Sequence, residues 1–295
     1  IITANANSDN VSVLTGNGDG TFNAKQDFAV GDRPVSVVLG DVNGDGFDDI
    51  VTANAYSDNV SVLTGKENGT FNPKQDFAAG EEPVAVVLGD LNGDDHLEIV
   101  TASFRRDNVS VMTGNGDGTF KVHHNVAAFG QRWSAVLGDV NGDGIDDIVT
   151  ANAYSDNVSV LTGIGNGTFN AAQNFTTGDG PFSVVLGDVN GDGFDDIVTA
   201  NRNSDNVSVL TGNGDGTFNT KQDFAVGDSP KSVVLGDANG DGFADIVTAN
   251  GGSDNVSVLT GNGDGTFNTN QDFAVGDGPN SVVLGDVNGD GFNDI

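Results

Sequence analysis

The sequence contains no cysteine, one methionine, one tryptophan and two tyrosines. Without cysteine the chain has neither a disulfide framework nor a thiolate metal site, so its stability must come from packing and from bound ions. It also lacks an apolar run of about 18 residues, the length that a membrane-spanning helix needs. We therefore expect no insertion into a membrane.

Positive charge is scarce as well. Lysine and arginine total 11 residues against 43 aspartates and glutamates, and the formal net charge is -32. Such a charge opposes folding by self-repulsion unless cations neutralise part of it. It also makes nucleic acid and anionic membranes poor partners. The 44 glycines suit an all-β protein with many tight turns better than a helical one.

The dominant feature is an acidic nonapeptide, DVNGDGFDD at residues 41–49, which the chain repeats. Each copy starts 49 residues after the previous one, which indicates six copies of one structural unit rather than different domains. We therefore predict a single domain over residues 1–295. The copies begin at Asp41, Asp90, Asp139, Asp188, Asp237 and Asp286.

One unit, residues 34–82, reads as four short strands. We expect them at residues 34–40, 50–54, 59–64 and 75–79, from their β-branched and alternating apolar residues. The first strand is expected to be buried on both faces. Asn-Gly and Asp-Gly pairs between the third and fourth strands favour hairpin turns. Each unit is thus predicted to be a four-stranded antiparallel meander.

Both faces of such a meander carry apolar residues, so neighbouring units must cover them. Radial closure leaves only short sheet edges, which favours an all-β, six-bladed β-propeller of four-stranded blades. The last blade would close by pairing residues 281–285 with the N-terminal strands. Ile1 and Ile295 occupy the same repeat position, so a longer array of blades also stays open.

The acidic loop offers oxygen donors at alternate positions: side chains at positions 1, 3, 5 and 9, and the backbone carbonyl at position 7. Hard oxygen ligands in a flexible, glycine-containing loop fit Ca²⁺ better than Zn²⁺ or Mg²⁺. We predict up to six structural calcium ions, about one per repeat. The ligands would be Asp41, Asn43, Asp45, Phe47, Asp49; Asp90, Asn92, Asp94, His96, Glu98; Asp139, Asn141, Asp143, Ile145, Asp147; Asp188, Asn190, Asp192, Phe194, Asp196; Asp237, Asn239, Asp241, Phe243, Asp245; and Asp286, Asn288, Asp290, Phe292, Asp294.

The second copy departs from the others, because Glu98 replaces the ninth-position aspartate and Asp95 replaces a glycine. We expect this site to survive with altered affinity.

The loop, with the preceding Val-Leu-Gly and the following Asp-Ile-Val-Thr, resembles the FG-GAP/VCBS repeat of integrin α-subunit propellers, bacterial surface proteins and some propeller lectins. The resemblance implies that the strand before the loop is innermost, and that the protein is extracellular or attached to the cell surface.

The repeats differ mainly in two segments, the turn between the second and third strands (the 2-3 turn) and the connection from the fourth strand to the next unit (the 4-1 connection). Both lie at the end of the sheet opposite to the acidic loop. Variation on a near-copied scaffold suggests a recognition surface, since loops on rigid elements often carry function; drift is the alternative. The candidate ligand-binding residues are Tyr56, Phe104, Arg105, Arg132, Trp133, Tyr154 and Phe182. Each aromatic ring among them could instead cover a neighbouring core.

The third unit holds much of the scarce positive charge and the only tryptophan, which indicates either a specialised site or a degenerate blade. No nucleophile paired with a base is evident, so we do not expect an enzyme. We expect a lectin-like cell-adhesion or binding protein, monomeric, that recognises a glycan or a cell-surface protein through the variable end. The alternative is a purely structural repeat scaffold, either a segment of an adhesin or an amplified or designed propeller without a ligand.

Overall fold

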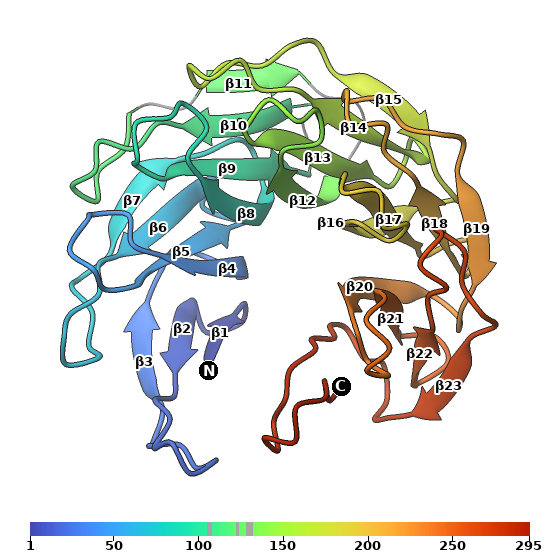
Figure 1. Cartoon of the computed structure of the whole chain (residues 1–295). Coiled ribbons are helices and arrows are strands. Elements are labelled where there is room, and N and C mark those ends of the chain that lie inside the picture. The colour runs from blue at the N-terminus through green and yellow to red at the C-terminus, as the bar shows by residue number, and fades with distance from the viewer. Residues whose placement is uncertain (105–107, 122–123, 128–131) are drawn as a thin grey trace. The chain divides into compact units, whose positions relative to one another are not determined.

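The computed structural model describes residues 1–104, 108–121, 124–127 and 132–295 (Figure 1). Within these residues every regular element is a β-strand, and no helix is long and apolar enough to cross a membrane. The strands form six antiparallel sheets, one for each repeat. This confirms the predicted all-β fold built from six β-propeller blades.

The chain divides into two compact units, which we describe separately. The first comprises Ile1–Ala135 and Gly163–Asn170. It holds an N-terminal sheet of three strands, β1-β2-β3, the first blade, β4-β5-β6-β7, and the second blade, β8-β9-β10-β11. These strands are β1 (Ile2–Asn5), β2 (Asn10–Val13), β3 (Gln26–Ala29), β4 (Pro34–Gly40), β5 (Asp49–Asn54), β6 (Asn59–Leu63), β7 (Gln75–Ala78), β8 (Pro83–Gly89), β9 (Glu98–Ser103), β10 (Asn108–Met112) and β11 (His124–Ala127).

The second unit comprises Val136–Thr162 and Ala171–Ile295. Apart from the first residues of β12, it holds the third blade, β12-β13-β14-β15, the fourth, β16-β17-β18-β19, and the fifth, β20-β21-β22-β23. These strands are β12 (Arg132–Gly138), β13 (Asp147–Asn152), β14 (Asn157–Leu161), β15 (Gln173–Thr176), β16 (Pro181–Gly187), β17 (Asp196–Asn201), β18 (Asn206–Leu210), β19 (Gln222–Ala225), β20 (Pro230–Gly236), β21 (Asp245–Asn250), β22 (Asn255–Leu259) and β23 (Gln271–Ala274).

The strands lie within a residue or two of the predicted ranges, but their burial differs from one expectation. Every residue of β5 is buried, whereas β4 is mostly half-buried and Leu39 is 44% exposed. The prediction that the first strand is buried on both faces is therefore wrong. The physical reason is position, because β4 lies at the edge of its sheet and β5 lies inside it. The pairing of β4 with β5 shifts in register between Pro34 and Ser36. β4 begins at Pro34, and a proline cannot donate a backbone hydrogen bond.

A polar ladder runs through the buried second and third strands of the first, third, fourth and fifth blades. In the first blade the Asn54 amide donates to Asn59 Oδ1 at 2.8 Å and to Ser61 Oγ at 2.9 Å. Ser61 Oγ donates to Asp76 on β7 at 2.7 Å. Since Asn59 begins the Asn-Val-Ser sequence of β6, that recurring triplet has a structural role in the sheet.

Residues 281–285 form no strand, although they repeat the sequence of β4. The backbone N–H of Val282 donates to Ser232 Oγ at 3.3 Å, as Val86 does to Ser36 Oγ in the first unit. Val282 packs in the apolar cluster of the fifth blade. The sheet at the N-terminus contains β1-β2-β3 only. Closure of a last blade by pairing of the two terminal segments stays a prediction.

Candidate functional site

Each acidic loop is folded around its first aspartate. Asp41 Oδ1 accepts the N–H of Gly44 at 2.7 Å, and Oδ2 accepts the N–H of Gly46 at 2.7 Å. Both glycines adopt left-handed backbones, with φ of 73° and 85°, a region that only glycine enters freely. Burial alone would raise the pKa of Asp41, but the loop's backbone N–H groups outweigh it and hold that pKa below its ordinary value. The same pair of bonds surrounds Asp90, Asp139, Asp188, Asp237 and Asp286.

The ninth-position carboxylate is buried and links two connections of its own blade. Asp49 is 0% exposed; its Oδ2 accepts the N–H of Val42 at 2.9 Å and its Oδ1 accepts the N–H of Gly65 at 2.6 Å. Burial raises the pKa of Asp49, and at the equivalent Asp196 it raises the pKa to about 6. A buried carboxylate is therefore present in each blade at the base of the loop.

The second loop keeps this arrangement despite its substitutions. Glu98 is 0% exposed, and its Oε2 accepts the N–H of Leu91 at 2.8 Å. Asp95 takes the left-handed backbone of the glycine that it replaces, with φ of 64°, and donates its N–H to Asp90. Burial raises the pKa of Glu98, as it does for Asp49. The longer side chain thus fills the role of the ninth-position aspartate.

The chemistry of the loop fits a hard cation. The donors are oxygens, and each carboxylate oxygen can accept a further interaction beyond the N–H bonds above. No ion pair of the described residues joins a lysine or arginine to Asp41, Asp45 or Asp49. However, no group of three or more His, Asp or Glu side chains is gathered for a metal ion in the described part of the chain. The predicted ligand sets therefore stay predictions.

The loops also connect neighbouring blades, which the sequence did not indicate. The carbonyl of Val42, at loop position 2, accepts the N–H of Gly118 in the second blade at 3.1 Å. The Val42 side chain is 3% exposed and packs with Ile99, Met112 and Phe120 of that blade. The same bond joins Gly167 to Leu91, Gly216 to Val140 and Gly265 to Val189. The loops that carry Val42, Val140 and Val189 therefore each contribute a core residue to the next blade.

At the other end of the sheets, hydrogen bonds tie the 2-3 turns to the 4-1 connections that follow them, wherever the structure describes both segments. Asp58, in the 2-3 turn of the first blade, accepts the N–H of Glu82 at 2.8 Å. The backbones of both residues are left-handed, with φ of 52° and 50°. The equivalent bonds run from Arg33 to Asp9, Gly180 to Asp156, Ser229 to Asp205 and Gly278 to Asp254. A common backbone thus presents different side chains in each repeat.

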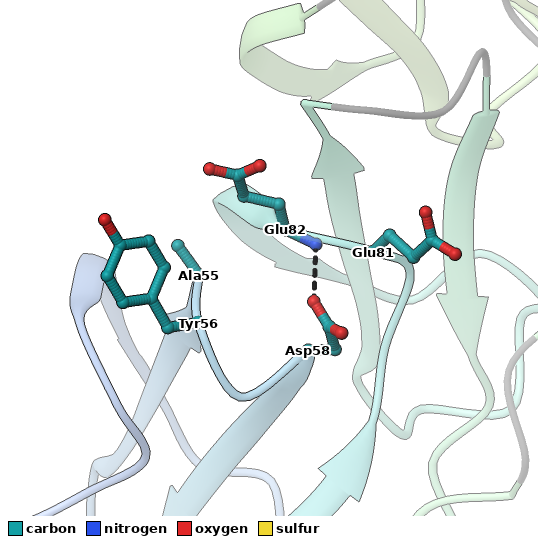
Figure 2. A pocket seen from close by; sticks show the side chains of 5 residues that line it. All are labelled: Ala55, Tyr56, Asp58, Glu81 and Glu82. Atoms are coloured by element: carbon teal, nitrogen blue, oxygen red, sulfur yellow. Dashed lines mark hydrogen bonds between the residues drawn. The ribbon is translucent and has the colours of Figure 1, made fainter.

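A pocket of about 270 Å³ lies at this end, between the first and second blades. It is lined by Ala55, Tyr56 and Asp58 of the 2-3 turn, and by Glu81 and Glu82 of the 4-1 connection. Figure 2 shows the Glu82 side chain extending toward the Tyr56 ring, while Glu81 points the other way. The pocket therefore combines one aromatic wall with carboxylates.

The positively charged side chain of Arg33 lies beside two residues that line this pocket, Tyr56 and Glu82. The Arg33 guanidinium lies over the Tyr56 ring, 4.7 Å from its centroid, and 4.0 Å from the Glu82 carboxylate. The Glu82 side chain is only 15% exposed. Tyr56, Arg33 and Glu82 thus form one stacked and charged group.

The candidate ligand-binding residues have different environments in the structure. Tyr56 and Tyr154 are 67% and 70% exposed, so neither ring covers a neighbouring core. Phe182 is half-buried, with the guanidinium of Arg202 5.7 Å from its ring centroid, and Phe104 is also half-buried. The structure places only Tyr56 of this set in the pocket. Arg105 lies outside the described residues, as do the side chains of Arg132 and Trp133.

Sequence reasoning missed the acidic side of the pocket, namely Asp58, Glu81 and Glu82. A signal was present, because Glu82 and Arg33 occupy a variable position next to a recurring proline. What the pattern lacked was the hydrogen bond between a 2-3 turn and the 4-1 connection 24 residues further along the chain.

Comparison with curated protein sequences gives no significant match. Among solved structures, the chain is similar to an Agrocybe aegerita lectin that recognises non-reducing terminal N-acetylglucosamine, with 20% identity and a TM-score of 0.59 over 92% of this chain and 79% of the lectin. It is similar to a protein of unknown function from Desulfotomaculum acetoxidans, with 13% identity and a TM-score of 0.71 over 93% and 80% of the two chains. It is also similar to the periplasmic gluconolactonase of Pseudomonas aeruginosa, with 15% identity and a TM-score of 0.63 over 94% and 85%.

At these identities the likeness concerns the fold, and the lectin and the gluconolactonase are β-propellers. The sequence carries a more specific relationship. The FG-GAP-like repeat matches residues 1–52, 41–101, 97–150, 139–199, 188–248 and 237–295, which together cover the whole chain. The chain therefore belongs to the FG-GAP-like repeat family.

Proposed function

We propose that this chain is an extracellular, calcium-stabilised β-propeller that binds a glycan at the end of the blades formed by the 2-3 turns and 4-1 connections. The observation that carries the proposal is the Tyr56 pocket, where an exposed aromatic ring and carboxylates lie on a backbone fixed by hydrogen bonds. Stacking surfaces and carboxylate acceptors suit the faces and hydroxyl groups of a sugar.

In this proposal calcium has a structural role. Asp41, Asn43, Asp45, the Phe47 carbonyl and Asp49 would hold the ion in the first loop, with the equivalent donors in the other loops. Bound Ca²⁺ would compensate the buried charge of Asp49 and fix the loop backbone. Because Val42 of that loop packs into the second blade, a fixed loop would also stabilise the contact between blades.

A binding role is proposed in preference to catalysis. The lining of the Tyr56 pocket contains no serine, cysteine, histidine or lysine, and we assign its carboxylates the role of hydrogen-bond acceptors rather than that of a glycosidase pair. The lectin with the same fold recognises a terminal sugar, which supports a glycan as the ligand to test first. The pocket lies at the variable end, where the repeats present different side chains.

The test is a glycan array, run beside a pull-down from intact cell surfaces, with the Tyr56→Leu variant and the matched Tyr154→Leu variant. We expect array binding that Tyr56→Leu abolishes and that Tyr154→Leu preserves. Capture of a deglycosylated cell-surface protein with a blank array would replace the glycan with a protein partner. If both assays were blank, the chain would be a structural scaffold, and the binding proposal would be wrong.

A further inference from the structure

The Tyr56 pocket is chemically distinct from the equivalent places in other repeats. The 2-3 turn of the third blade carries the only other tyrosine, Tyr154, but its facing connection has Asp179 and Gly180 in place of Glu81 and Glu82. The remaining described 2-3 turns carry no tyrosine. An aromatic ring with a glutamate directed toward it therefore occurs at Tyr56 and not at Tyr154.

The chain itself shows which chemical group this place attracts. The Arg33 guanidinium lies on the Tyr56 ring and at 4.0 Å from Glu82, a distance at the outer limit of an ion pair. Arg33 remains 43% exposed, whereas the Glu82 side chain is largely withdrawn from water. A mostly shielded carboxylate gains more from a close cation than an exposed one does, because water screens it less.

We infer that the Tyr56 pocket binds a sugar through a protonated primary amine, which contacts Glu82 and the Tyr56 ring where the Arg33 guanidinium now lies. The inference rests on the proposed glycan-binding function and names the class of sugar, a hexosamine with a free amino group. Acidic sugars are excluded by repulsion from Asp58 and Glu82. Arg33 acts as an internal competitor that the ligand displaces.

The size of the pocket supports a single sugar residue. Its volume of about 270 Å³ lies below the roughly 300–1,000 Å³ typical of sites for drug-sized ligands. The aromatic ring offers a stacking surface for the pyranose, and a cation over such a ring is attracted to its face. One ring and one ammonium group therefore match the contents of the pocket.

The experiment is a titration of the whole chain, in calcium-containing buffer, with methyl glucosaminide, methyl N-acetylglucosaminide, methyl glucoside and capped lysine, followed by NMR of a protein labelled on tyrosine. We expect methyl glucosaminide to bind several-fold more tightly than the other three and to shift the Tyr56 resonances. Its affinity should fall as salt rises. Equal affinity for the acetylated or the neutral sugar would overturn the inference. Tighter binding of capped lysine would overturn the assignment to a sugar.

Three variants test the roles of the residues. Glu82→Gln should weaken methyl glucosaminide about fivefold, whereas Glu81→Gln, whose side chain points away, should change it less. Arg33→Met should strengthen binding about threefold because the internal competitor is removed. If Arg33 instead donated hydrogen bonds to sugar hydroxyls, Arg33→Met would weaken binding, and that result would contradict the inference.

The outcome also separates this inference from the proposed function. If uncharged glycans bound and their binding needed Tyr56 but not Glu82, the proposed glycan-binding function would stand. The assignment of an amino sugar as the ligand would then be wrong. A positive array with unshifted Tyr56 resonances for every probe would lead to the same conclusion. Blank arrays and pull-downs would remove the function itself.

Discussion

Residue 103 provides a test of the polar ladder that runs through the blades. In the first, third, fourth and fifth blades this position is an asparagine, whereas the second blade has Ser103. In the third blade the Asn152 amide donates to Asn157 at 2.8 Å and to Ser159 at 2.7 Å, and it accepts the Thr150 hydroxyl at 3.1 Å. In the second blade the hydroxyl oxygens of Thr101 and Ser103 are buried without a partner.

Replacing Ser103 with asparagine should therefore stabilise the protein. Each restored hydrogen bond contributes about 0.5–1.5 kcal/mol net, and each buried unsatisfied group costs about 1–3 kcal/mol. After the loss of side-chain entropy, which is about 1 kcal/mol, we expect Ser103→Asn to raise the free energy of unfolding by about 2 kcal/mol. At roughly 2 °C for each kcal/mol in a chain of this size, the melting temperature should rise by about 4 °C.

The assay is thermal and chemical denaturation of Ser103→Asn beside the reverse change, Asn152→Ser, in the third blade. The reverse change should lower the free energy of unfolding by about 2–4 kcal/mol, because it leaves buried groups without partners. The reasoning would be refuted if Ser103→Asn were neutral or destabilising while Asn152→Ser was destabilising. That result would mean that water already satisfies the second blade.

Three further predictions concern the loops and connections. Val42→Ala should lower the free energy of unfolding, measured by urea denaturation, by about 2 kcal/mol. Val287 occupies the same loop position but is 86% exposed, so Val287→Ala should change that free energy little. Equal effects of the two substitutions would contradict the packing of loops into the next blade. Ser229→Gly should raise the melting temperature slightly, since Ser229 has φ of 55° and a left-handed backbone costs about 1 kcal/mol for a residue other than glycine; a fall would contradict this. In EDTA, lowering the pH from 7 to 5 should raise the melting temperature, because burial raises the pKa of Asp196 to about 6 and folding then favours its protonated form. Below about pH 4 the melting temperature should fall, because the pKa of Asp188 is lowered in the folded protein and its protonation then favours unfolding. A melting temperature that fell steadily from pH 7 would contradict the raised pKa of the buried Asp196 carboxylate.

Much of the fold could be predicted from the sequence, because the 49-residue period and the strand patterns are local. Residues 34–40 were expected to form a strand and are β4. The burial of that strand could not be predicted, since an apolar run does not tell an edge strand from a central one. The buried Val42 was missed for a similar reason, because its partners lie in the next repeat, where periodicity identifies equivalent residues but not neighbours.

The candidate site was predictable in part. The acidic loops were identified by their spacing, and Tyr56 by the disagreement among repeats. Glu82 was visible as a variable residue, but its approach to Tyr56 depends on the hydrogen bond between its own N–H and Asp58. Asp58 and Glu82 are 24 residues apart, so the local patterns that predict strands and turns do not contain this contact.

The most direct test of the account is the melting temperature in 1 mM calcium compared with that in EDTA. At a dissociation constant near 10⁻⁴ M, each occupied loop would add about 1.4 kcal/mol to the free energy of unfolding. With several loops occupied, the melting temperature should fall by about 10 °C or more on chelation and recover when calcium, but not magnesium, is restored. An unchanged melting temperature would contradict the claim that calcium in these loops holds the blades together.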